Sequence, residues 1–173
     1  MNNCSTCGHK LDSVEAGLKW HCSNCKKDVY ANPVPATNIL LFDEEGRILF
    51  GKRANEPYKG RLDAPSGFLD MNESFEQAIA RELKEELGLE AGDYSTPILV
   101  CSNINAYEDR QLIVVMFVAG TRHRDFPPND ESTDYIWLFP HEVTLELTLG
   151  QKNYYDSIQY AARYWQKVKD LAN

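Results

Sequence analysis

Apolar residues along the chain fall into short runs and into helical spacings. Runs of roughly four to eight apolar or β-branched residues, bounded by turn residues, are typical of strands. A turn-like sequence at 43–46 separates two such runs and predicts a hairpin. The expected strands are 37–42, 47–52, 97–104, 111–120 and 135–139, with a loop at 54–66.

Two segments carry helix signals. In 74–87, Ser74 and Gln77 fit a capping box at the start, and Gly88 fits a carboxyl-terminal cap. In 151–170 the apolar residues are spaced for one face of a helix, namely Ile158, Ala161, Ala162, Trp165 and Val168. The order of strands, helix, strands and helix predicts a mixed α/β sandwich.

Four of the five cysteines lie near the amino terminus, as Cys4-x-x-Cys7 and Cys22-x-x-Cys25. Two such pairs present four thiolates to one ion, so the spacing predicts a structural zinc ribbon over 1–30. A segment this short cannot bury a sufficient core, and a bound Zn²⁺ would stabilise it. Two disulfides are the alternative, which the absence of a visible secretory signal disfavours.

The overall composition suits one ordinary domain with a small appendage. The chain has 173 residues, of which 43% are hydrophobic. Two prolines in 31–36 indicate a linker between the ribbon and a main domain at 37–173. The longest apolar run has eight residues, whereas a membrane-spanning helix needs about 20. We therefore expect a cytoplasmic protein with no membrane partner.

The net charge of −8 is unevenly distributed. Residues 31–173 contain 14 basic and 23 acidic side chains, whereas 1–30 has a slight basic excess. An acidic main domain disfavours a broad surface for long nucleic acid. It does not exclude a small phosphorylated ligand that is bound through a metal ion.

The most informative segment is 67–89, which holds six acidic and two basic residues. On a helix, Glu82 lies three and four residues from Glu85 and Glu86, so the three side chains share one face. Like charges at this spacing repel, and a carboxylate cluster is what Mg²⁺ or Mn²⁺ selects. A solvated acidic helix face is the ordinary alternative.

The pattern of 67–89 matches G-x5-E-x7-R-E-U-x-E-E-x-G-U at every fixed position. The chain therefore resembles the Nudix hydrolases over roughly 35–170. The resemblance implies an α/β/α sandwich of the α+β class, with a mixed sheet between helices. It also implies metal-dependent hydrolysis of the pyrophosphate bond in a nucleoside diphosphate linked to another moiety.

The same resemblance assigns roles to individual residues. It implies that Mg²⁺ or Mn²⁺ is bound by Glu82, Glu85, Glu86 and the backbone carbonyl of Ser66. Glu85 and Glu86 are also candidate catalytic residues. Gly67, Glu73 and Arg81 match positions that support the helix and orient these ligands.

Candidates outside the motif are weaker. Arg53, at the end of an expected strand, is either a phosphate-binding residue or a surface arginine. Glu131, six residues before Trp137, resembles the later glutamate that serves as general base in some Nudix subfamilies, or it is one more loop acid. Weaker base candidates are Glu108, Asp109 and His123.

The substrate class follows from the arrangement of ribbon and motif. A four-cysteine ribbon joined through Tyr30-x-x-Pro33 resembles the NADH pyrophosphatases and a shorter group that includes FAD and ADP-ribose pyrophosphatases. The NADH group carries a Ser-Gln-Pro-Trp-rich signature after the motif, which this chain lacks. Candidates for stacking on a base are Tyr58, Phe68, Tyr107 and Tyr135, each with an ordinary alternative as a core or surface residue.

Two rival hypotheses stay open. In one, the protein senses a nucleotide and the ribbon docks nucleic acid or protein, since Trp20 lies among lysines. In the other, an enzyme acts on nucleotide-capped RNA. The ribbon could also serve only as a stabiliser or as a homodimer contact.

Overall fold

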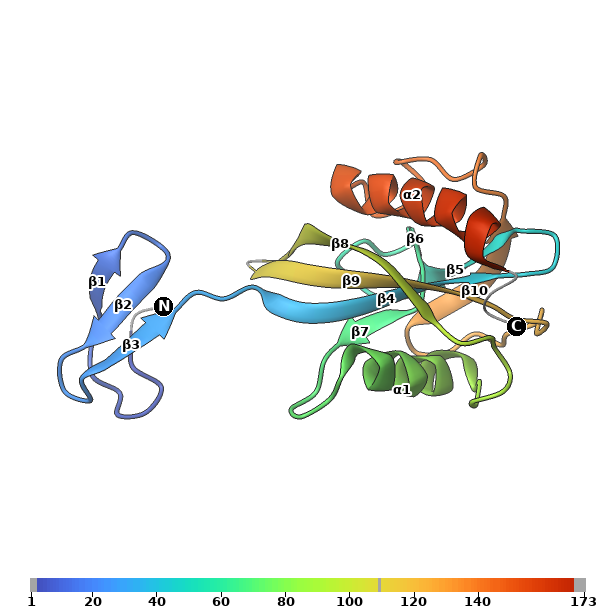
Figure 1. The fold of residues 1–173 in the computed structure, drawn as a ribbon. Helices are drawn as coiled ribbons and strands as arrows, with labels where there is room; N and C mark the ends of the chain where they lie inside the picture. Colours follow the sequence, from blue (N-terminus) through green and yellow to red (C-terminus); the bar gives the residue numbers. More distant parts are fainter. Residues whose placement is uncertain (1–2, 109, 170–173) are drawn as a thin grey trace. The chain divides into compact units, whose positions relative to one another are not determined.

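The computed structural model describes residues 3–108 and 110–169. Asp109 and the last position of the expected helix 151–170 lie outside this part. The chain divides into two compact units, Met1–Pro33 and Val34–Asn173, which are described separately (Figure 1). Neither described helix has the combined length and apolar character that crossing a bilayer requires.

The first unit is a three-stranded antiparallel sheet. Its strands follow one another in the order β1 (Asp12–Glu15), β2 (Lys19–Cys22) and β3 (Lys27–Tyr30). The buried core of this unit is small and consists of Cys4, Leu11 and Cys22. Because so little apolar surface is buried, the fold of this unit depends on what holds its cysteines together.

The second unit is built on a mixed sheet with the strand order β10-β5-β4-β9-β8. Short strands β6 and β7 pair with β5 and β4. Strands β4 and β9 run parallel, and the other pairs are antiparallel. The strand bounds are β4 (Val34–Phe42), β5 (Ile48–Arg53), β6 (Leu62–Asp63), β7 (Ser66–Phe68), β8 (Ile98–Tyr107), β9 (Arg110–Gly120) and β10 (Ser132–Leu138).

Two helices cover opposite faces of this sheet, α1 (Phe75–Leu87) and α2 (Lys152–Val168) (Figure 1). Successive residues of a strand point to opposite faces. Accordingly Leu40 of β4 packs in the cluster that contains α2 residues, whereas Ile39 and Leu41 pack in the cluster that contains α1 residues. The expected mixed sheet between helices is confirmed.

The helix caps are confirmed as well. Ser74 accepts a hydrogen bond from the backbone N–H of Gln77, whose side chain bonds back to the Ser74 backbone. Gly88 ends α1 in the left-handed conformation at φ 69°, which glycine adopts without steric cost.

The strands differ from expectation in four places. β8 runs to Tyr107, three residues beyond its expected end, and β10 begins at Ser132, three residues before its expected start. β4 begins at Val34, within the expected linker, because Val34 pairs with Leu112 in the long parallel ladder with β9. The segment 54–66 is not entirely loop, since it contains β6 and the first residue of β7. These strands have two and three residues. They exist because β5 and β4 offer edges to pair with, which no local pattern reveals.

Candidate active site

Gly67 of β7 lies directly against the carboxylate of Glu82 on α1. A Cβ atom added at Gly67 would lie 1.7 Å from Oε1 and 2.1 Å from Cδ of Glu82. Only glycine leaves room for the carboxylate, which therefore packs directly against the β7 backbone. Glu82 is 8% exposed in consequence.

Arg81 links α1 to the loop that precedes it. Its guanidinium donates to both carboxylate oxygens of Glu73, at 2.9 and 3.0 Å, and to the Phe68 carbonyl at 2.9 Å. A paired, two-point contact of this kind fixes orientation as well as distance. Hydrogen bonding by Arg81 lowers the pKa of Glu73, and hydrogen bonding by Glu73 contributes most to raising the pKa of Arg81.

The same guanidinium also contacts two carboxylates of the helix. Its Nη1 donates to Glu82 Oε1 and, at 3.2 Å, to Glu85 Oε2. Glu85 is exposed, with 60% of its side-chain surface accessible. Arg81 therefore holds two like charges that would otherwise repel each other.

Glu86 is half-buried and turned toward β7. Its Oε1 accepts a hydrogen bond from the backbone N–H of Ser66 at 3.1 Å. Burial raises the pKa of Glu86 well above its usual value, and the charges of Glu131, Glu82 and Asp63 raise it further. Burial also raises the pKa of Glu82, against the opposing effect of Arg81. Partly desolvated carboxylates are the donors that a hard divalent cation selects. The carboxylate oxygens among the described residues do not converge within 4.8 Å of one another as the amino-terminal sulfur atoms do, so binding a cation would draw these side chains together.

Hydrogen bonds made by Asn129 and Tyr135 join the end of α1 to the loop before β10, and we call this set of bonds the loop clamp. The loop clamp positions Glu131 in the same cavity as Glu82 and Glu85. Asn129 Nδ2 donates to the Glu86 carbonyl at 2.7 Å, and Tyr135 Oη donates to that carbonyl at 3.2 Å. Asn129 Oδ1 in turn accepts the backbone N–H groups of Glu131 and Ser132, at 2.9 and 2.8 Å. Sequence reasoning missed this role of Asn129, although an asparagine in a Pro-Pro-Asn-Asp loop is a typical backbone-binding residue.

Arg53 is held beside these carboxylates by a buried chain of polar groups. It donates to the Pro57 carbonyl at 3.0 Å and to Asp63 at 3.1 Å. Asp63 also accepts the Tyr154 hydroxyl proton at 2.7 Å, and that hydroxyl accepts the Ala64 N–H at 3.0 Å. Neither Asp63 nor Tyr154 carries a sequence signal, because they are brought together from 91 positions apart.

A cavity of about 550 Å³ unites most of the predicted residues. The predicted residues in its lining are Arg53, Ser66, Gly67, Phe68, Arg81, Glu82, Glu85, Tyr107 and Glu131. Glu86 is held against this lining through Ser66, and Glu73 through Arg81. Residues distant in sequence thus meet in one acidic cavity, whose lining also includes Arg53 and Arg81.

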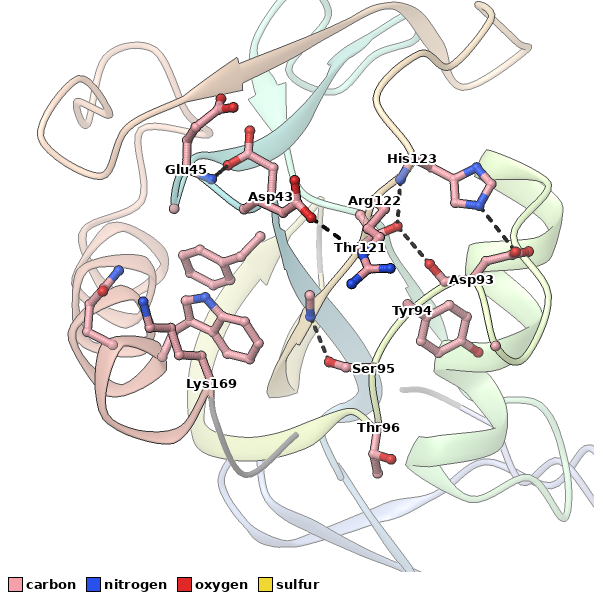
Figure 2. Close-up of a pocket in the computed structure, with 17 residues that line it drawn as sticks. Asp43, Glu45, Asp93, Tyr94, Ser95, Thr96, Thr121, Arg122, His123 and Lys169 are labelled. Atoms are coloured by element: carbon pink, nitrogen blue, oxygen red, sulfur yellow. Dashed lines mark hydrogen bonds and ion pairs between the residues drawn. The ribbon is translucent and has the colours of Figure 1, made fainter. Parts of the chain in front are cut away.

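A second cavity of about 740 Å³ contains none of the predicted metal ligands (Figure 2). His123 lies there, with its ring directed at Asp93 and 3.2 Å from that carboxylate (Figure 2). His123, a weaker candidate for the general base, thus contacts Asp93 and is not part of the lining of the acidic cavity.

The four amino-terminal cysteines form their own cluster. Their sulfur atoms all lie within 4.8 Å of one another, the one such group of metal-ligating side chains among the described residues. Hydrogen bonds, chiefly from Asn24, lower the pKa of Cys7 to about 6, and hydrogen bonding with Cys7 raises that of Cys25 to about 12. Four thiols this close fit a tetrahedral Zn²⁺. His21, which lies beside Cys22 in the sequence, contacts Asp28 at 2.8 Å and lies outside this cluster.

Comparison with known families agrees with this geometry. The sequence model described as the NUDIX domain matches residues 32–159. The chain belongs to the Nudix family. The motif at 67–89, called the Nudix box below, is therefore part of a Nudix domain, as are the mixed sheet and the two helices that cover it.

Curated relatives match over part of their length. The chain is 37% identical over 94 residues to Nudix hydrolase 19, chloroplastic, of Arabidopsis thaliana, which is 52% of this chain and 21% of that protein. It is 39% identical over 64 residues to the ADP-ribose pyrophosphatase of Methanocaldococcus jannaschii, 37% of each chain. It is 35% identical over 89 residues to the NAD-capped RNA hydrolase NudC of Haemophilus influenzae, 50% of this chain and 33% of that protein. The matches thus span about a fifth to about a third of these relatives.

Solved structures share the fold. A NUDIX hydrolase from Nitrosomonas europaea superposes with a TM-score of 0.70 at 22% identity, covering 98% of this chain and 94% of the other. The MutT protein from Methanosarcina mazei gives a TM-score of 0.66 at 21% identity, covering 79% and 98%. At these identities the likeness concerns the fold alone.

Proposed function

We propose that this Nudix protein hydrolyses the diphosphate bond of a nucleoside diphosphate joined to a second moiety, such as ADP-ribose, FAD or NADH. The observation that carries the proposal is the shared cavity, in which Glu131 and Arg53 join the box residues Glu82 and Glu85. The named activities of the relatives support the same substrate class, because they include an ADP-ribose pyrophosphatase and hydrolases of NAD-capped RNA.

Glu82, Glu85 and Glu86 would hold Mg²⁺ or Mn²⁺, together with the carbonyl of Ser66. When bound, the cation supplies positive charge that lets an anionic diphosphate approach these carboxylates, and it polarises the phosphorus. Gly67 and Arg81 position the ligands, since the first admits Glu82 and the second anchors both Glu82 and Glu85.

Two residues act on the substrate itself. Arg53, oriented by Asp63 and the Pro57 carbonyl, pairs with a phosphate oxygen and steadies it for attack. Glu131, exposed in the cavity, accepts the proton of the attacking water. The bond between phosphorus and the bridging oxygen breaks, and two phosphorylated products leave.

The test is a substrate panel of ADP-ribose, FAD, NADH, diadenosine polyphosphates and nucleoside triphosphates, with Mg²⁺ or Mn²⁺ and with products separated by chromatography. We expect cleavage of at least one diphosphate-linked substrate to two phosphorylated products, and loss of that cleavage in EDTA. Failure to cleave any member of the panel with either ion would overturn the proposal, as would full activity in EDTA.

A second candidate function is the hydrolysis of NAD-capped RNA. It is favoured by the 35% identity to a NAD-capped RNA hydrolase and by the presence of the ribbon. We propose that the ribbon is a Zn²⁺-stabilised module at 1–30, which the linker 31–36 joins to the catalytic domain at 37–173. A kcat/KM for NAD-capped RNA at least equal to that for NADH would support this second function, and cleavage of NADH alone would contradict it.

A further inference from the structure

Asn105 is a buried amide that faces the active-site cavity. It lies in β8, is 8% exposed, and forms part of the lining of the 550 Å³ cavity that contains Glu82 and Glu85. Its Oδ1 atom is covered and has no hydrogen-bond partner among the described residues, as is also true of Asn38 Oδ1, which lies in the same cavity near Ser66, and of Asn103 Oδ1, outside the cavity. A buried carbonyl oxygen without a partner is costly, so its place in a ligand cavity needs an explanation.

The backbone on both sides of Asn105 is fixed by the start of α2. The Gln151 side chain accepts from the Ala106 N–H at 3.0 Å and donates to the Ala106 carbonyl at 2.8 Å. Asn153 donates to the Ile104 carbonyl at 2.8 Å. These neighbouring amides are therefore occupied, and they hold Asn105 in place without contacting its Oδ1.

The walls around Asn105 are apolar and aromatic. Its cross-strand partner is Leu112, which is buried together with Ala36. On the same face of β8, the Tyr107 ring meets the Phe68 ring edge-to-face with centroids 6.0 Å apart. All four of these residues line the cavity. Apolar and aromatic walls beside an unpartnered amide oxygen suit a flat heteroaromatic ring that carries a hydrogen-bond donor.

The sheet register places Asn105 at a distance from the carboxylates. Ser66 pairs with Asn38, and Asn38 pairs with Met116 of β9, whereas Asn105 pairs with Leu112. The separation between Asn38 and Asn105 is therefore four residues along β9 and two strand spacings, or about 13 Å along and about 10 Å across the sheet. This span has room for the ribose that separates the diphosphate from the base.

We propose that Asn105 selects the adenine ring of the substrate. Its Oδ1 accepts a hydrogen bond from the exocyclic amine, its Nδ2 donates to the adjacent ring nitrogen, and Tyr107 and Phe68 contact the ring. An asparagine amide matches this donor and acceptor pair of adenine, whereas guanine presents two acceptors at the corresponding edge. The inference rests on the proposed function, whose leading substrates ADP-ribose, FAD and NADH all contain adenine.

The experiment compares ADP-ribose with its hypoxanthine counterpart, in which a carbonyl replaces the exocyclic amine and the sugars and diphosphate are unchanged. Wild-type protein, Asn105→Leu and the control Asn103→Leu are assayed with Mg²⁺. Asn103 lies on the same face of the same strand and its Oδ1 also lacks a partner, but its Nδ2 donates to Ser157 at 3.0 Å and the residue does not line the cavity. The control therefore separates a place in the cavity from the loss of a buried amide.

We expect the wild type to prefer ADP-ribose in kcat/KM by roughly 5- to 150-fold. Asn105→Leu should lose this preference mainly through a lower kcat/KM for ADP-ribose, and Asn103→Leu should keep it. Equal wild-type values for the two substrates would overturn the inference, even if the variant does not fold, and so would a preference retained in Asn105→Leu. Cleavage of neither substrate by the wild type would also overturn the inference, while cleavage of another diphosphate in the panel would leave the proposed function standing. Cleavage of no diphosphate in the panel would refute both.

Discussion

Gly67→Ala tests how the fold builds the acidic cavity, because it adds one methyl group where the carboxylate of Glu82 now lies. The new Cβ would be 1.7 Å from Oε1, whereas ordinary contact begins near 3.4 Å, so the carboxylate must withdraw by about 1.7 Å. The backbone at Gly67 does not have the positive φ that would strain an alanine. The effect should therefore be purely steric.

The expected loss follows from that displacement. A misplacement of about 1 Å in a reacting constellation can cost about 100-fold in rate, so kcat should fall by at least that factor. Overpacking should also lower the free energy of unfolding by about 1–3 kcal/mol. Steady-state kinetics on ADP-ribose with Mg²⁺ and denaturant unfolding measure the two quantities.

Two controls identify the clash as the cause. Gly120→Ala also adds a methyl group inside a strand, but its nearest neighbours are Trp165 atoms at 3.2 and 3.3 Å, so a small rotation relieves the contact. This variant should keep wild-type kcat. In a Glu82→Ala background, Gly67→Ala should cost little further stability, because no carboxylate remains to collide with. A Gly67→Ala enzyme with kcat within threefold of wild type, or an equal stability loss in both backgrounds, would refute the reasoning.

Three further predictions concern the metal ligands, the ribbon and the loop clamp. Glu85→Gln and Glu86→Gln should each fold but lose most turnover, because a neutral amide is a poor Mg²⁺ ligand. Circular dichroism checks the fold and steady-state kinetics give kcat. Near-wild-type rates in both variants would contradict the assignment. Cys22→Ser should release Zn²⁺ and destabilise 1–30 while most Nudix activity remains, and one zinc per chain by elemental analysis would count against the ribbon. Asn129→Ala should lower kcat about as much as Glu131→Gln, with no further loss in the double variant, because both remove the same positioned carboxylate; additive losses would show that the clamp acts elsewhere.

The parts of the fold that the sequence predicts well are those with local signals. Both ends of α1 are set by local contacts, namely the capping box of Ser74 and Gln77 and the glycine cap at Gly88. Because each contact lies within one turn of the helix, the bounds of α1 can be predicted from the local sequence. The box motif is equally local, because Gly67 and Glu82 lie on adjoining elements.

The parts that escape prediction depend on distant partners. Strands β6 and β7 have no periodic pattern of their own and form only against β5 and β4. The chain of Arg53, Asp63 and Tyr154 joins positions up to 101 apart in sequence, and burial decides its members. Likewise, no local pattern distinguishes Asn105 from other strand residues. Its place in the cavity lining follows from the pairing of β8 with β9.

The measurement that tests the central claim most directly is anomalous diffraction from crystals soaked in Mn²⁺. The account predicts a manganese peak in the acidic cavity, bound by carboxylates among Glu82, Glu85 and Glu86. Crystals of catalytically active protein that show no manganese at these carboxylates would contradict it.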